Sequence, residues 1–245
     1  MIRKLCIFAV VLLVCIPASA QRHIWSKQGS IFDLYGLHKG ALPPSKRVYS
    51  PDHTKYLELL WSRYKGFLVP SLSLVSGTQT IEVPYDALWN EAEAVWSPDS
   101  KSFSLTGNLN GYTNSTRLFR VRGKTLQRIS LAPFHRDMAG SYPPCRALNQ
   151  VLGDCRKSSN GSDFNYATVA WSASATAVIM AEVPCDSLWG GIMCQVEAYE
   201  LDIGTGRIVA RIDAREFKKK WQPSLAWNFR IPDPPEWEGA LKQAQ

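Results

Sequence analysis

Trp96-Ser97-Pro98-Asp99-Ser100-Lys101 decides the fold, because two other segments of the chain repeat its pattern. Tyr49-Ser50-Pro51-Asp52 is the earlier copy, and Trp171-Ser172-Ala173-Ser174 is a later copy without the proline and the aspartate. Proline presets φ for a turn, and aspartate accepts hydrogen bonds from the backbone that follows it. An apolar strand comes after each copy: Tyr56 to Leu60, Ser102 to Thr106, and Ala177 to Ala181. The pattern therefore predicts three β-hairpins.

A second strand follows each hairpin and ends at a glycine turn. These strands and turns are Leu72 to Val75 with Gly77, Leu118 to Val121 with Gly123, and Tyr199 to Asp202 with Gly204 and Gly206. A further strand comes next, such as Leu126 to Leu131 or Arg207 to Ile212. Each repeat is therefore expected to form a four-stranded antiparallel sheet.

The repeat resembles the TolB-type, WD40-like β-propeller repeat (PD40-like). The resemblance rests on the aromatic-Ser-Pro-Asp-x-Lys turn, the two strands after it and the Gly-Thr-Gly-Arg turn, and it covers roughly residues 48 to 213. Ser100 stands where that family usually has glycine. The resemblance implies an all-β, propeller-like array of antiparallel four-stranded sheets with about three full repeats. Its members include binding proteins, peptidase-associated domains and accessory envelope proteins.

Three repeats are too few to close a ring, so the ends of the domain matter. Ile31 to Gly36 resembles the second half of a repeat, and Ala226 to Phe229 lies where another first half should begin. Together they could form a composite blade that joins the two termini and protects sheet edges. An open stack of three sheets with irregular ends is the alternative.

The chain starts with a segment typical of a signal peptide. Arg3 and Lys4 precede an apolar run from Cys6 to Ile16, and Ala18-Ser19-Ala20 is a small-x-small cleavage site. The run is shorter than the roughly 20 residues of a membrane span, although an uncleaved anchor is the alternative. We expect residues 1–20 to be removed, residues 21–231 to form one domain, and residues 232–245, which are rich in proline, to form an extended tail. The predicted location is the periplasm or the exterior, with no transmembrane anchor after cleavage.

Four cysteines remain after the predicted cleavage, and each insertion in the repeat carries two of them. Cys145 and Cys155 lie in the first insertion, and Cys185 and Cys194 lie in the second. An even number of cysteines in an oxidising compartment predicts two disulfides. Local pairing within each insertion is the simplest arrangement, and pairing between the insertions remains open. Zinc is the other alternative, but no Cys-x-x-Cys is present.

Charge argues against one class of partner. Removing two basic residues with the signal peptide lowers the net charge from +7 to +5, and Lys218-Lys219-Lys220 is the only basic run. Nucleic-acid binding is therefore not expected. An envelope or extracellular protein or glycan is the expected partner.

The sequence contains no catalytic or cofactor signature. Gly-x-Ser-x-Gly, His-Glu-x-x-His, the Walker loop and Gly-x-Gly-x-x-Gly are all missing. His135 and Asp137 either form a local acid–base pair or belong to a solvated loop. Asp154, Asn160 and Asp163 are too few ligands for a calcium site. We therefore expect no catalytic residue, no metal and no cofactor.

Aromatic residues in expected loops are the better candidates for binding. Tyr112, Tyr142, Trp189 and Trp89 lie near glycine or proline, outside the packing positions of the repeat. Exposed aromatic side chains often anchor proteins and sugars. Trp96 and Trp171, in contrast, are expected in the core.

The expected function is that of a non-catalytic binding or scaffold protein that presents disulfide-stapled loops. A hydrolase of envelope glycan or peptide, with a site assembled from several sheets, is the alternative. A structural fragment that needs a partner chain to complete its sheets is a third.

Overall fold

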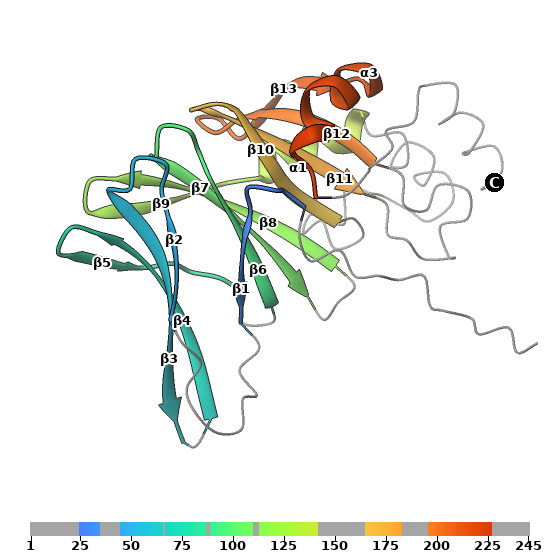
Figure 1. Cartoon of the computed structure of the whole chain (residues 1–245). Coiled ribbons are helices and arrows are strands. Elements are labelled where there is room, and N and C mark those ends of the chain that lie inside the picture. The colour runs from blue at the N-terminus through green and yellow to red at the C-terminus, as the bar shows by residue number, and fades with distance from the viewer. Residues whose placement is uncertain are drawn as a thin grey trace, which may run out of the picture.

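The protein is built from three antiparallel β-sheets that follow one another across the molecule (Figure 1). The computed structural model describes residues 25–34, 45–65, 67–86, 89–109, 113–141, 165–182 and 196–226. The expected all-β class with one antiparallel sheet per repeat is confirmed. The predicted signal peptide, the tail from residue 232 and all four remaining cysteines lie outside the described residues.

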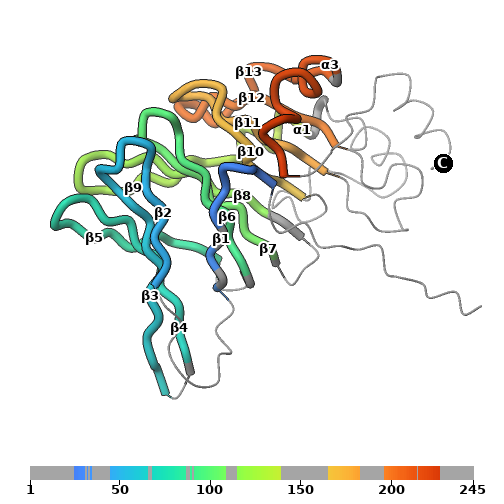
Figure 2. Tube along the Cα trace, in the orientation of Figure 1, coloured from blue at the N-terminus to red at the C-terminus, as the bar shows by residue number. Residues whose placement is uncertain are grey.

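Each repeat forms a meander in which neighbours in sequence are neighbours in the sheet. The first sheet contains β2 (Lys46–Tyr49), β3 (Lys55–Tyr64), β4 (Phe67–Ser76) and β5 (Gln79–Glu82). The second contains β6 (Trp89–Trp96), β7 (Ser102–Leu109), β8 (Thr113–Arg122) and β9 (Thr125–Ile129), together with β1 (Ser30–Asp33). The third contains β10 (Asn165–Ala173), β11 (Thr176–Glu182), β12 (Val196–Asp202) and β13 (Arg207–Ile212). The trace in Figure 2 shows the same order.

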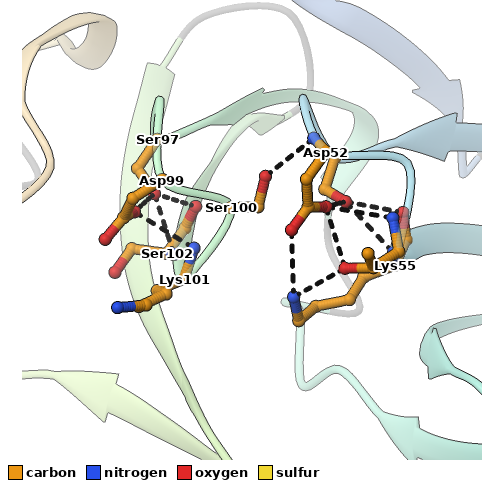
Figure 3. A network of polar contacts seen from close by, with 9 residues as sticks. Asp52, Lys55, Ser97, Asp99, Ser100, Lys101 and Ser102 are labelled. Carbon is orange, nitrogen blue, oxygen red and sulfur yellow. Dashed lines mark hydrogen bonds and ion pairs between the residues drawn. The ribbon is translucent and has the colours of Figure 1, made fainter.

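The Ser-Pro-Asp turns close their hairpins with the same hydrogen bonds in the first and second sheets (Figure 3). The hydroxyl of Ser97 contacts the Asp99 carboxylate at 2.7 Å, donates to the Ser102 carbonyl at 2.9 Å and accepts from the Ser102 amide. Ser50 makes the equivalent contacts in its own turn. The serine thus satisfies both backbone groups that face the turn.

Ser100 stands where the repeat that this chain resembles usually has glycine, and a contact of its side chain accounts for the difference. Its φ is +58°, in the left-handed region where glycine is normally favoured. The Ser100 hydroxyl accepts a hydrogen bond of 3.0 Å from the amide of Asp52 in the preceding repeat (Figure 3). The side chain that strains the backbone therefore also joins the turns of two adjacent sheets.

The tryptophans of the second and third repeats also reach back to the preceding sheet. The Nε1–H of Trp96 donates to the carbonyl of Val48 in β2, and the Nε1–H of Trp171 donates to the carbonyl of Val95 in β6, both at 3.3 Å. Trp96 is buried, as expected, whereas Trp171 is only partly buried against the core. Tyr49 occupies the same position in the first repeat, and its side chain is 48% exposed.

The N-terminal strand does not start a composite blade. β1 pairs antiparallel with β6, from Ser30 opposite Ala94 to Asp33 opposite Glu91, and is the fifth strand of the second sheet. The expected role of Ile31 to Gly36 as half of a separate repeat is therefore wrong; the edge of β6 was available for pairing, and residues 227–229 lie outside the described part. The two ends still meet, because Ser26 and Leu225 form an isolated β-bridge.

Three apolar clusters hold the layers together. One lies between the first two sheets and includes Leu57, Leu72, Trp96 and Phe103. The next joins the second and third sheets to helix α1 (Ala132–Ser141) through Leu118, Ile179, Tyr199 and Phe134. The expected strand to Leu131 thus ends earlier, because the chain turns into α1 after Ile129.

The last cluster covers the outer face of the third sheet and forms a cap. Trp25, Phe217, Trp221 and Leu225 pack on residues of β10 to β13 such as Val178. They come from the N-terminal segment and from α3 (Ala214–Glu216), η2 (Phe217–Trp221) and η3 (Gln222–Ser224). Within the described ranges, no helix is long and apolar enough to cross a bilayer.

Glu93 anchors the N-terminal segment beneath this cap. Its carboxylate accepts hydrogen bonds from the amides of Trp25 at 2.9 Å and Ser26 at 2.8 Å, and its side chain is fully buried. Burial raises the pKa of Glu93 to about 7, and the two amide bonds oppose that rise. A Cβ on Gly29 would lie 1.8 Å from the carboxylate oxygen, so only glycine fits there.

Candidate functional site

A cavity of about 660 Å³ lies where the first insertion leaves and rejoins the sheets. Its described lining comes from the linker before β6, from β8, from β9 and from the start of α1, with Tyr166 of β10 on the far side. α1 ends at Ser141, and the chain re-enters the sheets at Asn165. The start of α1 and Tyr166, the residue after this re-entry, line the cavity, while residues 142–164, which carry Cys145 and Cys155, lie outside the described residues.

One wall of the cavity is a strand that is only half paired. β9 pairs with residues 118–122 of β8, from Leu118 opposite Ile129 to Arg122 opposite Thr125. The other half of β8, from Thr113 to Arg117, has no strand on that side among the described residues. Ser115, Thr116 and Arg117 of this half line the cavity. A strand edge of this kind can accept another extended chain.

Arg117 is held in position by three neighbours. Its guanidinium lies 4.9 Å from the ring centroid of Trp89, and it donates to the carbonyl of Pro84 at 3.3 Å. The Asp86 carboxylate is 3.5 Å away, which is a long and partly exposed ion pair. The side chain is 17% exposed. The aromatic ring and the backbone carbonyl orient the guanidinium without neutralising it.

A second guanidinium faces the same cavity. Arg128 lies on β9, and the β8–β9 register places it opposite Phe119, on the same face of the sheet as Arg117. Burial lowers the pKa of Arg117 most, the positive charge of Arg128 lowers it further, and Asp86 acts in the opposite direction. Asp86 is the only carboxylate among the described lining residues. The cavity therefore has an excess of positive charge.

Helix α1 contributes the aromatic wall. His135 lies in the helix and packs against Tyr166, with ring centroids 5.2 Å apart. The sequence suggested either a His135–Asp137 pair or a solvated loop, and both suggestions are wrong. The two residues lie in a helix, where His135 contacts Tyr166 and Asp137 contacts Arg207. Asp137 forms two hydrogen bonds with the guanidinium of Arg207, at 2.6 and 3.1 Å. These bonds are the main reason that the pKa of Asp137 lies below its usual value.

Trp89 is not the exposed loop aromatic that the sequence suggested. It lies in β6, it is 2% exposed, and its Nε1–H donates to the Ser115 hydroxyl at 3.2 Å. The ring occupies the space above Gly107, where a Cβ would come within 1.8 Å of Cδ2. The glycine in the neighbouring strand thus lets the tryptophan fold inward, and the ring supports Arg117 from below. Tyr112, Tyr142 and Trp189 lie outside the described residues, so their roles stay predictions.

Sequence reasoning missed Arg117 and Arg128, although one signal could have found them. The two-residue turn at Gly123-Lys124 fixes the β8–β9 register, since Arg122 pairs with Thr125. Counting outward from that turn places residues 117 and 128 on one face, two positions apart across the hairpin. In the part of the chain that the structure describes, no three His, Cys, Asp or Glu side chains converge as a metal site.

Comparisons with known proteins give structural similarity alone. No protein-family model matches the sequence, and curated proteins give no match. The chain is similar to the crystal structure of TolB from Acinetobacter baumannii, with 14% identity and a TM-score of 0.35 over 69% of this chain and 32% of that one. It is also similar to the β-propeller domain of the Trilobed protease from Pyrococcus furiosus, described as having an open velcro topology. There the identity is 14% and the TM-score 0.34, over 69% of this chain and 41% of that one. The chain thus spans less than half the length of either structure.

Proposed function

We propose that this chain is a non-catalytic binding protein that takes an extended, acidic segment of an envelope or extracellular protein along the free half of β8. The observation that carries the proposal is the pair of arginines, Arg117 and Arg128, in a cavity with a single described carboxylate. Backbone pairing along the strand edge would supply affinity, and an acidic side chain in the cavity would supply specificity.

Electrostatics support an anionic ligand. The Asp86–Arg117 contact of 3.5 Å is partly exposed, and such ion pairs contribute little. A carboxylate that enters the cavity could instead form short, bidentate bonds with a guanidinium. Because Trp89 and the Pro84 carbonyl already orient Arg117, little side-chain freedom is lost on binding.

The position of the cavity connects this proposal to the insertion loops. α1, whose first turn lines the cavity, is followed in the sequence by residues 142–164, which contain the predicted disulfide between Cys145 and Cys155 and the candidate Tyr142. The predicted signal peptide supports a partner outside the cytoplasm. A glycan partner and the hydrolase alternative gain no support from a specific contact, and two carboxylates flanking a substrate bond would be needed for glycoside hydrolysis.

Titration with a matched pair of peptides tests the proposal. One labelled peptide alternates glutamate with valine, and the other replaces every glutamate with glutamine. We expect the acidic peptide to bind, with an affinity that falls as salt is added. The double variant Arg117→Gln/Arg128→Gln should bind at least about tenfold more weakly, because truncating charged partners in an interface costs 2 kcal/mol or more. Arg117→Lys should recover only part of the loss, since lysine lacks the planar fork.

Arg47→Gln is the matched control, because Arg47 belongs to the first sheet and pairs with Glu58 at 2.6 Å. This variant should bind like the wild type. Equal affinity for both peptides, or equal loss in the control, would contradict the proposal. Binding of an anionic polysaccharide in place of the peptide would assign a glycan partner, and cleavage of either probe would favour the hydrolase.

A further inference from the structure

The hairpin of β3 and β4 extends well beyond the other strands of the first sheet (Figure 1). β2 pairs only with residues 56–59 of β3, and β5 pairs only with residues 73–76 of β4. Beyond the part that β2 and β5 reach, β3 and β4 pair only with each other, from Leu60 opposite Ser71 to Tyr64 opposite Phe67. We call residues 60–71 the arm. Four residues of strand span about 14 Å, so the tip of the arm stands clear of the sheet.

Exposed apolar side chains concentrate on this arm. Five large hydrophobic residues are exposed among those the structure describes, and three of them belong to the arm. Tyr64 is 62% exposed, Leu60 42% and Val69 41%. The register places Leu60 and Tyr64 on one face of β3, and Val69 lies on the same face of β4, opposite Ser62. These side chains gather on one face of one hairpin rather than being scattered singly, which is typical of an interaction surface.

The charges on the arm all have one sign. The stretch from Leu60 to Ser71 contains Arg63 and Lys65 and no aspartate or glutamate. The ammonium of Lys65 lies 5.3 Å from the ring centroid of Tyr64, so the cation and the aromatic ring share the tip. Arg63 pairs opposite Leu68 and therefore lies on the other face of β3, so Lys65 is the cation beside the apolar face. A partner of this face meets apolar and aromatic side chains next to positive charge, which favours a partner with negative charge.

We propose that the arm binds the surface of an anionic lipid bilayer. Tyrosine prefers the headgroup region, where its ring is in an apolar environment and its hydroxyl stays wet, and Lys and Arg next to it contact lipid phosphates. Leu60 and Val69 would enter the boundary with the acyl chains, at the 5–10 Å depth typical of interfacial segments. At the base of the arm, the Tyr85 hydroxyl donates to the Pro70 carbonyl at 2.8 Å, so this end stays tied to the first sheet while the tip meets the headgroups.

A lipid surface fits these observations better than a protein does. An apolar protein face would bury Lys65 away from water, which is costly without an opposite charge at a matching position. A headgroup layer supplies negative charge at every lateral position and does not need shape complementarity. This inference does not depend on the proposed function, because the arm belongs to the first sheet and the arginine cavity lies between the second and third.

Vesicle flotation tests the inference with the mature protein. The probes are vesicles of phosphatidylcholine alone and of phosphatidylcholine with 30% phosphatidylglycerol, which is a composition that we choose. We expect binding only to the anionic vesicles, and weaker binding at higher salt. The variant Arg63→Gln/Lys65→Gln should lose about fivefold for each cation removed. Replacing Leu60, Tyr64 and Val69 together by serine should abolish flotation while leaving the melting temperature near the wild-type value.

Two matched controls use features elsewhere on the surface. Val209, on β13, is the fifth exposed hydrophobic residue at 60% exposure, and Lys218 and Lys219 are exposed cations of η2. Val209→Ser and Lys218→Gln/Lys219→Gln should leave flotation within about twofold of the wild type. A loss in the lysine control equal to that of the arm variant would show general charge attraction and overturn the inference. Equal binding to both vesicle types would also overturn it, as would arm-dependent dimerisation in sedimentation velocity without binding to lipid.

Discussion

The two outer sheets of this molecule end in opposite ways. The third sheet has its outer face covered by the cap of Trp25, Phe217, Trp221 and Leu225, all of which are buried. The first sheet has no described element over its outer face, where Tyr49, Leu60, Tyr64 and Val69 are exposed. Both sheets come from the same repeat, so the repeat itself does not decide whether a face is covered. Segments outside the repeat make that decision.

Tyr49 and Trp96 show the contrast at one position of the repeat. Trp96 packs against the first sheet and donates to the carbonyl of Val48, whereas no described sheet precedes Tyr49, which remains half exposed. The same motif position is thus a core residue inside the stack and a surface residue at its open end.

Replacing this aromatic residue should therefore have very different effects in the two repeats. Trp96→Ala should lower the free energy of unfolding by about 4–5 kcal/mol, because it leaves a large cavity and also removes the Val48 hydrogen bond. Tyr49→Ala should stay within about 0.5 kcal/mol of the wild type. Denaturant unfolding measures both. Similar losses in the two variants would show that something covers the first sheet.

The cap can be tested in the same way. Phe217 is 1% exposed in the cluster on the third sheet. Phe217→Ala should cost about 3–4 kcal/mol, as expected for a fully buried aromatic residue. Tyr64→Ala, on the open sheet, is the control and should change stability by less than about 0.5 kcal/mol. A mild effect of Phe217→Ala would mean that the cap contributes little to the fold.

Acidity should act on the capped end through Glu93. The folded-state pKa of about 7 lies above the ordinary 4.5, so the folded protein holds a proton that the unfolded chain releases between these values. Stability should therefore be greatest below pH 4.5 as far as this group is concerned, and it should fall by about 3 kcal/mol as the pH rises to 7. The carboxyls of Asp137 and Asp202, whose pKa values are lowered, act only at more acidic pH.

Glu93→Gln isolates this contribution. The amide mimics the protonated acid, so the variant should lose most of the decline in melting temperature between pH 5 and 7. Thermal melts at constant ionic strength provide the measurement. A decline as steep as that of the wild type would assign the pH dependence to other groups.

The smallest effect concerns the turns that join the first two sheets. His53 and Ser100 both have φ near +58°, at 57° and 58°, but only the Ser100 hydroxyl bonds to the neighbouring repeat. His53→Gly should stabilise the protein by about 0.5–1 kcal/mol, because it relieves left-handed strain at an exposed site. Ser100→Gly gains the same relief and loses a hydrogen bond of about 1 kcal/mol, so its net effect should be close to zero. Equal stabilisation in both variants would show that the bond to Asp52 has no energetic role.

The sequence predicts what is local and leaves open what depends on pairing at a distance. The Ser-Pro-Asp turns and the strands after them are where the pattern placed them, because proline, aspartate and alternating apolar residues act over a few positions. The place of β1 could not be read, since four residues could pair with any free edge. The cap was also missed, because the apolar residues of η2 have meaning only beside the third sheet. At the site, Arg117 needed the β8–β9 register, and Trp89 needed Gly107 in the neighbouring strand.

The meeting of the two ends has a consequence for the order of folding. Lys27 donates to the carbonyl of Pro223, 196 positions away, and Trp25 bonds to Glu93, 68 positions away. Closing a loop of this length costs about 5 kcal/mol of chain entropy, so these contacts form after the local hairpins. A chain that emerges from its N-terminus cannot bury Trp25 until the last turn of η2 has appeared. The N-terminal residues, which leave the ribosome first, are therefore the last to become fixed, and the fold stays incomplete until synthesis has passed η2.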